Sequence, residues 1–541
     1  MNNKPPLVWS IAGLDSGGGA GLSADQRAAD AAGVHLCPVA AALTAQNSVA
    51  VEAVFPVSAE SLDAQLAALE GDLPPAAIKT GLLGGVEQLR VVVRWIDRLR
   101  ERGPVALVVD PVLRASTGAN LADEALLCAY REELLPRASV VTPNRGEAAR
   151  LAGEAGPPEQ ARALRRLGVG GVCITGGDDA GDLALDWLDT EHASGWLALP
   201  RRPSLNNHGT GCTFATALAA ALARGFVDAD AAVIAKMLTT SGLSANIQPP
   251  GAGAGPVQPC QDFIRDAGLL PALFDDESPP AAWPAARRGP PAVEGVYAIT
   301  DNGAHAARLF AAGLRTVQLR VKRGAEEGQA EWQRRLRDEI AAARRHDGTL
   351  IVNDHWREAL AAGVDFIHLG QEDLLSLSAA DRQDLAAARL RGLRLGLSSH
   401  SLWELARAVA WSPDYIACGP VWPTLTKAMP WRPQGPPNLA WWSAMAPAPV
   451  VGIGGVLEPQ QLAEIAASGA SAGCVVRGLA AGASHSPQAW QQAWREGAAR
   501  RPPNPPCWPS PSLAFKPDLG GQPRIRCRQA LQRLLQESGA S

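Results

Sequence analysis

The sequence lacks three patterns that would each indicate a different class of protein. Its nine cysteines occur singly, without a Cys-x-x-Cys pair, which argues against a zinc or redox site. No run of about 18 apolar residues predicts a membrane span, and no apolar segment typical of a secretory signal follows Met1. An odd number of cysteines without such a signal favours a reducing, cytoplasmic location.

The chain also lacks an excess of basic residues. It has 50 Lys and Arg against 54 Asp and Glu, a net charge of −4, whereas nucleic-acid and membrane-surface binders are usually basic. Hydrophobic residues make up 47%, enough for sizeable cores. Because one core stops growing at about 250–300 residues, we expect the 541 residues to form two domains, with a third possible.

Two proline-rich stretches divide the chain. Pro271–Glu294 combines prolines, small residues and charges without periodicity, which is typical of an interdomain linker. A second break follows Arg500, and beyond it Arg524–Gln536 has the spacing of a surface helix packed on the second domain. The prediction is a domain at 1–270, a linker at 271–294, a domain at 295–500, and a proline-rich tail with a short helix at 501–541.

Both halves alternate β-branched runs with Ala/Leu-rich helical stretches, the pattern of α/β proteins with mostly parallel strands. The first half fits an open, doubly wound sheet, since its glycine-rich turns follow only a few strands. The second half fits a (β/α)8, or TIM, barrel. Its eight expected strands begin near Val296, Thr316, Leu350, Phe366, Arg394, Tyr415, Val450 and Gly473.

Two glycine-rich segments of the first half suit anion binding. Gly13–Gly21 follows a strand-like run, and glycines let backbone N–H groups approach a ligand closely. Asn206–Cys212 opens a long helix whose N-terminus offers free N–H donors. Such a loop can stabilise the charge on a transferring phosphoryl group. An ordinary glycine turn and an ordinary helix cap are the alternatives.

An ordered series of motifs then becomes recognisable between Leu7 and Val257. The series resembles the hydroxymethylpyrimidine/phosphomethylpyrimidine kinases of the ribokinase superfamily. This resemblance implies a ribokinase-like α/β sandwich, ATP as co-substrate, Mg²⁺, and a possible homodimer through this domain. The motifs are Gly13–Gly21, Ala42–Asn47, Ile78–Leu83, Val109–Val112, Thr142–Asn144 with Glu147, His208–Cys212 and Gly251–Val257.

The resemblance assigns expected roles to particular residues. Gln46 and Gly19 would bind the pyrimidine, for which an amide supplies both a donor and an acceptor. Gly209, Gly211 and Cys212 would form the anion hole and act in catalysis. The residues expected at the nucleotide phosphates and the metal are Asp15, Lys79, Asp110, Asn144 and Glu147.

Two positions depart from the family pattern. Thr175 precedes Gly176-Gly177 where the family usually has Lys, and Asp15-Ser16-Gly17 replaces the usual Asp-Pro-Ser. The missing Lys leaves open a domain that senses the pyrimidine without phosphorylating it. Pyridoxal kinase activity is a further alternative for this half.

In the second half, Thr316–Lys322 alternates polar and aliphatic residues. Period two places Gln318, Arg320 and Lys322 on one face of a strand, which is a poor core but a good anion site. The next two strands lead to Asp354 and Asp373. Barrel active sites collect at strand ends, so we predict that these carboxylates share one Mg²⁺ bound to a pyrophosphate. A solvated edge strand and two helix caps are the alternatives.

From Gly295 to Ala498 the order of motifs resembles thiamine-phosphate synthase. By that resemblance Ser398 and Lys427 are catalytic, and Arg477 stands where the family commonly has Ser, with its direction left open. Departure of pyrophosphate would precede attack by the thiazole nitrogen, which requires no strong base. The remaining expected contacts are Gln318, Arg320, Lys322, Asn353 and Lys427 for the pyrimidine pyrophosphate, and Thr424, Thr426, Gly454 and Arg477 for the thiazole phosphate.

The two halves together predict a bifunctional fusion, because the product of the kinase would be the substrate of the synthase. Its partners would be small molecules, namely hydroxymethylpyrimidine, its phosphates, thiazole phosphate and ATP, with no nucleic acid and no membrane. A thiazole isomerase barrel is the alternative for the second half. It would not need the cations of Thr316–Lys322.

Overall fold

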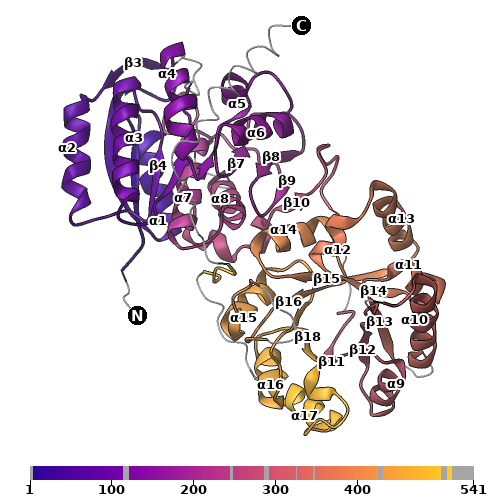
Figure 1. Ribbon diagram of the computed structural model, residues 1–541. Coiled ribbons are helices and arrows are strands. Elements are labelled where there is room, and N and C mark those ends of the chain that lie inside the picture. Colours follow the sequence, from indigo (N-terminus) through magenta and orange to yellow (C-terminus); the bar gives the residue numbers. More distant parts are fainter. Residues whose placement is uncertain are drawn as a thin grey trace. The chain divides into compact units, whose positions relative to one another are not determined.

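The computed structural model describes residues 4–113, 121–243, 248–284, 291–324, 326–344, 348–424, 430–500 and 508–513. Its contacts divide the described chain into two compact units, one ending at Trp283 and one running from Pro284 to Leu513 (Figure 1). The helix expected at Arg524–Gln536 lies outside the described residues. Within them, no helix is both long and apolar enough to cross a membrane.

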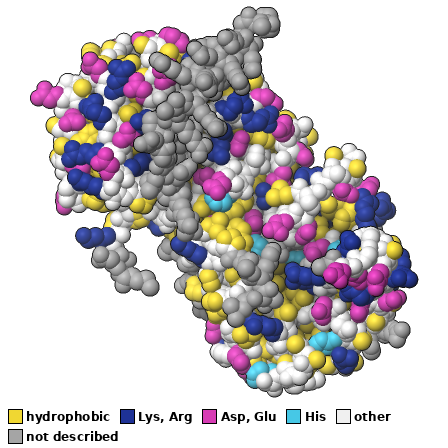
Figure 2. All heavy atoms as spheres, viewed as in Figure 1, with side chains coloured by type: hydrophobic (Ala, Val, Ile, Leu, Met, Phe, Trp, Pro, Cys, Tyr) yellow, Lys and Arg dark blue, Asp and Glu magenta, His cyan; other side chains and the backbone are white. Residues whose placement is uncertain are grey.

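On the face drawn in Figure 2, basic and acidic side chains are interspersed over each unit. This mixture agrees with the small net charge of −4. A large single-sign surface, which would attract a polyanion, is not seen on that face.

The first unit is built on one ten-stranded sheet. Its strands are β1 (Leu7–Asp15), β2 (His35–Gln46), β3 (Val51–Pro56), β4 (Ala77–Thr80), β5 (Ala106–Val109), β6 (Val140–Val141), β7 (Val172–Ile174), β8 (Leu183–Asp189), β9 (Ser194–Pro200) and β10 (Ala272–Phe274). They lie in the order β10-β9-β8-β7-β6-β5-β4-β1-β2-β3. The six strands from β7 to β2 in this order are parallel, and β3, β8, β9 and β10 each pair antiparallel with the preceding strand.

Helices cover both faces of this sheet because its central strands are apolar on both sides. Trp9 and Ile11 of β1 join the core formed with α2 (Ala59–Glu70), α3 (Val86–Arg100), α4 (Glu124–Ala129), α5 (Arg145–Ala152) and α6 (Pro157–Arg166). Ser10 faces the other way and bonds to Asp25 of α1. On that second face α1 (Gly21–Ala32), α7 (Thr210–Ala223) and α8 (Asp228–Leu243) pack together. The predicted doubly wound sheet is confirmed.

The order in which successive strands are added to the sheet reverses at β1, because β2 lies on one side of β1 and β4 lies on the other. In open α/β sheets, ligands bind outside the carboxyl ends of the strands at such a switch point. The motif-bearing loops after β1, β5 and β6 therefore share one edge of the sheet.

The structure differs from the predicted linker at its start. Ala272–Phe274 forms β10 and pairs with β9, and both Ala272 and Leu273 are completely buried. A three-residue strand carries no periodic signal of its own, so the charged and proline-rich composition that follows it determined our prediction.

The second unit is a closed barrel of eight parallel strands. Each strand begins within one residue of its predicted position, so the predicted (β/α)8 barrel is confirmed. The strands are β11 (Gly295–Thr300), β12 (Thr316–Leu319), β13 (Thr349–Asn353), β14 (Phe366–Leu369), β15 (Arg394–Ser399), β16 (Tyr415–Cys418), β17 (Val450–Gly452) and β18 (Ala472–Val475). The helices are α9 (Gly303–Ala311), α10 (Gln329–Ala343), α11 (Trp356–Ala361), α12 (Gln371–Ser376), α13 (Ala379–Leu390), α14 (Leu402–Trp411), α15 (Gly435–Met445), α16 (Pro459–Ala467) and α17 (Pro487–Ala498).

One strand is shorter than its alternation predicted. β12 ends at Leu319, and only the backbone N–H of Arg320 continues the ladder, to the carbonyl of Thr300 at 2.8 Å. Gln318 is buried, Arg320 is half-buried at the end of the strand, and Lys322 is exposed. The three polar side chains therefore become more exposed along the segment, and only that of Gln318 lies in the barrel interior.

A short part of the predicted tail packs on the barrel unit. The N–H of Arg432 donates to the carbonyl of Ser512 at 2.8 Å, and the N–H of Ser510 donates to the side chain of Asn438 at 3.0 Å. Ser512 is only 2% exposed. Trp508–Leu513 therefore belongs to the second unit.

Two candidate active sites

Asp15 ends β1 and organises the glycine-rich loop that follows. Its carboxylate accepts hydrogen bonds from the backbone N–H groups of Gly17 at 2.8 Å, Gly19 at 3.0 Å and Ala20 at 2.8 Å. Burial works to raise the pKa of Asp15, but these bonds and one from His208 bring that pKa below its usual value. The carboxylate thus faces its own loop, and its place beside bound phosphates stays a prediction.

Gln46, at the end of β2, lies next to His208. The Nε2 atoms of the two side chains are 3.2 Å apart, and the same histidine nitrogen is 3.2 Å from Oδ2 of Asp15. A Cβ atom on Gly19 would lie 2.0 Å from Cδ2 of His208, so only glycine permits this approach. His208 belongs to the motif His208–Cys212, and the motif predicted no role for it.

Helix α7 begins directly after Gly209, whose φ of 86° lies in the left-handed region. A Cβ atom there would also lie 2.4 Å from the carbonyl oxygen of Gly19. Gly211 is exposed and Cys212 is half-buried, and both lie in the first turn of α7. The backbone N–H groups of a first helical turn have no partner within the helix, so those of this turn are available to a ligand beside the glycine-rich loop. Burial raises the pKa of the Cys212 thiol to about 12, which keeps the thiol neutral near neutral pH.

A buried charge cluster lies between β4, α1 and α7. The Nζ atom of Lys79 is 3.0 Å from both carboxylate oxygens of Asp25 and 3.7 Å from Oδ2 of Asp110. Asp25 also accepts bonds from Ser10 at 2.6 Å and Thr216 at 2.8 Å. Lys79 is completely buried, which does not suit the direct nucleotide contact that we predicted for it.

Asp110 follows β5 and points into the same cluster. Burial raises the pKa of Asp110 to about 6, and the positive charge of Lys79 limits this rise. The side chain is only 5% exposed. A change in the charge of Lys79 would therefore reach the ligand-binding edge through this carboxylate.

Asn144 and Glu147 form the capping box of α5. The side chain of Asn144 accepts from the N–H of Glu147, and Glu147 accepts from the N–H of Asn144, both at 2.9 Å. Burial and the nearby Asp110 raise the pKa of Glu147 to about 8. Both residues follow β6 at the ligand-binding edge of the sheet, and their contribution to a metal site stays a prediction.

Position 175 lacks the family's Lys, but the positively charged Arg145 lies close to the glycine that follows it. Arg145 approaches Gly176 so closely that a Cβ atom there would lie 2.7 Å from one of its guanidinium nitrogens. The guanidinium pairs with Asp179 at 3.1 Å and lies over the ring of Trp196 at 5.2 Å. A guanidinium, paired with the carboxylate of Asp179, therefore lies beside Gly176 although residue 175 is Thr.

A chain of hydrogen bonds crosses the interior of the barrel. Gln318 donates to the hydroxyl of Tyr297 at 2.7 Å, and the hydroxyls of Tyr297 and Tyr415 are 2.7 Å apart. Tyr415 lies 2.7 Å from Nδ1 of His368, whose Nε2 is 2.9 Å from Oγ of Ser398. This series of hydrogen bonds links Gln318 to Ser398. The two residues were predicted to contact different parts of one substrate.

Tyr297, Tyr415 and His368 were missed by our sequence analysis. All three interrupt apolar strand runs, and the whole chain has only three tyrosines. Gly396 makes room for one of them, because a Cβ atom there would lie 2.1 Å from Cζ of Tyr415. A polar aromatic residue inside a predicted barrel strand was the available signal.

Burial, together with Arg320 and His400, lowers the pKa of His368 to about 3. Its ring is therefore neutral over the physiological range and offers one donor and one acceptor. Its position in the buried chain is thus fixed by hydrogen bonding rather than by charge.

Asp354 and Asp373 come together at the ends of β13 and β14. Asp354 has a φ of 66° and donates its N–H to the carbonyl of His368 at 2.9 Å, while Asp373 accepts from the N–H of Gly370 at 2.8 Å. Burial and the adjacent Asp373 raise the pKa of Asp354 to about 6. A cation would relieve the repulsion between these carboxylates.

This donor set fits Mg²⁺, which binds one or two carboxylates and keeps several waters. Among the described residues no group of three or more His, Cys, Asp or Glu side chains is placed to hold a metal. Asn353, next in the chain, is buried and hydrogen-bonds to Asp354. The pair is therefore suited to a largely hydrated ion.

The loops after β16 and β17 run together. The N–H of Val421 donates to the carbonyl of Ile453 at 2.8 Å, and that of Trp422 donates to Gly454 at 3.1 Å. Thr424 follows in the first loop, and Arg477 is exposed directly after β18, the strand next to β17. Thr426 and Lys427, both predicted here, lie outside the described residues.

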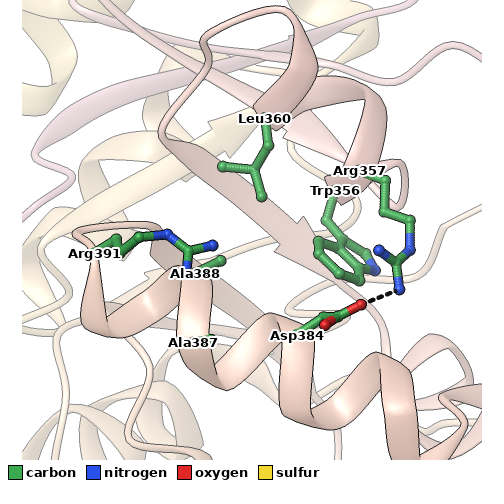
Figure 3. A pocket seen from close by; sticks show the side chains of 7 residues that line it. All are labelled: Trp356, Arg357, Leu360, Asp384, Ala387, Ala388 and Arg391. Atoms are coloured by element: carbon green, nitrogen blue, oxygen red, sulfur yellow. Dashed lines mark hydrogen bonds and ion pairs between the residues drawn. The ribbon is translucent and has the colours of Figure 1, made fainter.

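A separate shallow hollow lies between α11 and α13 (Figure 3). Arg357 and Asp384 form an ion pair of 2.8 Å beside it, and the guanidinium of Arg357 covers the ring of Trp356 at 4.3 Å. The hollow is lined by helix residues rather than by strand ends. None of the predicted site residues lines it, and we assign it no function.

Comparison with known proteins gives two family matches. Residues 15–258 match the family described as phosphomethylpyrimidine kinase, and residues 296–479 match thiamine monophosphate synthase. The chain is 32% identical over 472 residues to the probable thiamine biosynthetic bifunctional enzyme, chloroplastic, of Oryza sativa subsp. japonica, covering 83% of this chain and 81% of that relative.

Other relatives match the first unit. The hydroxymethylpyrimidine/phosphomethylpyrimidine kinase of Rhizobium meliloti is 41% identical over 267 residues, covering 48% of this chain and 99% of the relative. The solved pyridoxal kinase of Bacillus subtilis in an ADP complex is 30% identical, with a TM-score of 0.43, and covers 48% of this chain and 99% of that one.

Proposed function

The chain belongs to the family of bifunctional thiamine biosynthetic enzymes, and from this premise we propose which residues carry its two activities. The first unit is a hydroxymethylpyrimidine/phosphomethylpyrimidine kinase that uses ATP, and the second is a thiamine-phosphate synthase. The relatives do not support a non-catalytic pyrimidine sensor. The pyrophosphate made by the first unit is the substrate of the second.

In the kinase unit, Gln46 and Gly19 contact the pyrimidine while the start of α7 receives the transferring phosphoryl group. The glycine-rich turn at Gly209, Gly211 and Cys212 supports this assignment, because its N–H groups are fixed before the reaction begins. The neutral Cys212 thiol lies at the phosphoryl position. The residues proposed near the phosphates and Mg²⁺ are Asp15, Asp110, Asn144 and Glu147, all at the carboxyl ends of parallel strands.

Arg145 supplies the positive charge near the nucleotide phosphates that Thr175 does not. Its guanidinium lies against Gly176, at the end of β7 and beside Asn144. Lys79 is too deeply buried for this role. The proposal explains how the kinase activity persists with Thr at position 175.

In the synthase unit, the buried hydrogen-bond chain that reaches Ser398 carries our assignment. Gln318, which its buried tyrosine partners hold in place, contacts the pyrimidine pyrophosphate, and Ser398 lies beside the reacting methylene. Asn353, Arg320 and Lys322, with Lys427 of the segment that follows β16 in the sequence, hold the pyrophosphate. Thr424, Gly454 and Arg477 contact the thiazole phosphate at the ends of β16, β17 and β18, and the sequence motif assigns Thr426 to the same phosphate.

Asp354 and Asp373 would hold Mg²⁺ in this unit. Bound Mg²⁺ neutralises charge on a departing pyrophosphate. The protein's own side chains, rather than the metal, orient the pyrimidine. Its methylene carbon then faces the thiazole nitrogen as the C–O bond breaks. No residue needs to remove a proton in that step, and the neutral His368 is consistent with this requirement.

We also propose that the protein is a homodimer formed through the kinase unit. Leu14, Leu43 and Phe55 are cross-strand neighbours on β1, β2 and β3, and they are 41%, 45% and 58% exposed. Contiguous exposed apolar residues commonly mark an interface. Sedimentation of the Phe55→Glu variant tests this, since the variant should sediment as a monomer if the stripe is the interface.

A cytoplasmic location completes the proposal. All seven cysteines of the described residues are free thiols, as expected in a reducing compartment. Fractionation of cells of the source organism, followed by detection of the protein with an antibody, tests it. Recovery with the membrane or a secreted fraction would contradict this assignment.

The central experiment is a coupled assay on the purified full chain. Hydroxymethylpyrimidine, ATP, Mg²⁺ and thiazole phosphate should give thiamine phosphate. The Gly209→Val variant, whose Cβ would lie 2.4 Å from the carbonyl oxygen of Gly19 and so displace the N–H groups of this turn, should lose this product and recover it when pyrimidine pyrophosphate is supplied, whereas Ser398→Ala should remain impaired under both conditions. Product from neither mixture with the unmodified chain would overturn the synthase assignment.

A further inference from the structure

Four polar side chains and one carbonyl form a continuous network at the end of β1 and β2. Oδ2 of Asp15 is 3.2 Å from Nε2 of His208, which is 3.2 Å from the Gln46 amide. The other end of that amide is 3.3 Å from Oγ1 of Thr44, and Oγ1 donates to the carbonyl of Leu14 at 3.1 Å. Asp15 and Thr44 are 5% and 9% exposed, so water does not replace these partners freely.

The hydrogens of this network have one consistent arrangement. The pKa of Asp15 is lowered by the bond from His208 and by backbone N–H groups, so its carboxylate is ionised and only accepts. Nε2 of His208 must then carry a hydrogen, and this one hydrogen is shared between Oδ2 of Asp15 and the Gln46 amide, since each lies 3.2 Å from the ring nitrogen. A ring nitrogen that carries a hydrogen has no lone pair left to accept a bond from an amide N–H.

This requirement fixes the Gln46 amide. Its Oε1 must face His208, and its Nε2 must face Thr44, because the opposite orientation would bring two N–H groups together. The hydroxyl hydrogen of Thr44 is already donated to Leu14, which leaves its oxygen free to accept from Nε2 of Gln46. Every donor in the network then has an acceptor.

We propose that Asp15 and His208 fix the orientation of the Gln46 amide and thereby select the hydrogen-bonding edge of the substrate that the kinase unit accepts. Oε1 keeps one lone pair and Nε2 one hydrogen for a ligand. The matching edge pairs an exocyclic amino donor with an adjacent ring-nitrogen acceptor, in one spatial order. An aromatic ring without that amino group leaves Oε1 unpaired, which disfavours its binding.

This inference deepens the proposed function, since it rests on the proposed contact between Gln46 and the pyrimidine. His208 is a positioning residue here, because it acts through Gln46 and need not touch the reacting atoms. Its effect should therefore appear in the KM for the pyrimidine and not in the kcat or in the KM for ATP.

The test uses the full chain with hydroxymethylpyrimidine and ATP. His208→Leu removes the donor to Gln46, and Thr44→Val removes the acceptor, each from one end of the amide. We expect each to raise the pyrimidine KM about tenfold, the effect of one lost hydrogen bond, with kcat and the KM for ATP changed less than about twofold. His208→Gln retains a side-chain N–H and should recover most of the affinity.

His35→Leu, at an exposed histidine on β2, is the matched control. Synthase activity with supplied pyrimidine pyrophosphate and a thermal unfolding curve show that each variant is folded. His208→Gln and Thr44→Val keep the test informative if His208→Leu does not fold.

The outcomes distinguish the contact of Gln46 with the pyrimidine from the orienting role of His208. If Gln46→Leu leaves the pyrimidine KM unchanged, the proposed contact of Gln46 is wrong. If Gln46→Leu raises this KM but His208→Leu and Thr44→Val do not, only the orienting role is overturned. A loss confined to kcat in the His208 variants would also overturn it, because His208 would then serve phosphoryl transfer.

Discussion

Nε2 of His368 lies 2.9 Å from Oγ of Ser398, at the carboxyl ends of the neighbouring strands β14 and β15. On its other side, Nδ1 of His368 is 2.7 Å from the hydroxyl of Tyr415. Because the ring is buried and neutral, it holds Ser398 through a hydrogen bond whose direction depends on Tyr415. The geometry of the synthase site is thus set from inside the barrel.

Replacing His368 by Phe should lower the synthase kcat about tenfold, because Ser398 loses the bond that positions it. The loss should be equal across about pH 5 to 8, since the pKa of His368 is held near 3 and the ring does not titrate there. Rates with supplied pyrimidine pyrophosphate measure this. Kinase activity of the same variant is the control, and a loss seen only at one end of the pH range would contradict the prediction.

Magnesium binding by the synthase unit should weaken as the pH falls through about 6. The pKa of Asp354 is raised to about 6, so its carboxyl is protonated below that pH and must release a proton to bind the metal. Below pH 6 the Mg²⁺ concentration for half-maximal synthase activity should rise about tenfold per pH unit, and excess Mg²⁺ should restore activity.

Asp354→Asn should remove this pH dependence and lower activity at every Mg²⁺ concentration. Asp338→Asn, at an exposed carboxylate on α10, is the matched control. An unchanged Mg²⁺ requirement between pH 5 and 7 in the unmodified chain would show that Asp354 does not bind the metal.

The Lys79–Asp25 pair should be essential for the stability of the first unit. Lys79→Met leaves a completely buried carboxylate without its cation, which destabilises a protein by about 3–5 kcal/mol. Hydrogen exchange of the β4 and α7 amides in the full chain measures this loss. The double variant Lys79→Met/Asp25→Leu should recover much of it.

The exposed pair of Arg90 and Glu133 provides a comparison for this measurement. Arg90→Met should change exchange in β4 and α7 little, because water screens an exposed pair. Equal effects of Lys79→Met and Arg90→Met would show that burial of the Lys79 cluster has no energetic importance.

Arg145→Met should raise the KM for ATP about tenfold while leaving the pyrimidine KM unchanged, because the positive charge beside Gly176-Gly177 is lost. Steady-state kinase kinetics with each substrate varied in turn measure both constants. Adding Thr175→Lys to this variant should restore part of the ATP affinity. A rise in the pyrimidine KM alone would contradict this prediction, because it would place Arg145 at the pyrimidine rather than at the ATP phosphates.

The sequence by itself determined the architecture of both units and the family. The eight barrel strands start within one residue of their predicted positions, because each is a short apolar run bounded by polar loops, and such runs are local features. Most candidate site residues could also be proposed from the sequence. Asp15, Gln46, Asp354 and Ser398 lie at the ends of strands, within motifs that are contiguous in the chain.

Only the tertiary structure decided which polar groups meet. His208 is 193 residues from Asp15, and Tyr415 is 118 residues from Tyr297, yet each pair shares a hydrogen bond. The burial of Lys79 likewise follows from helix α7 packing over β4 and from Asp25 of α1 reaching its ammonium group. Pairing across such separations depends on how the sheet and barrel close, and no local pattern in a single sequence records it.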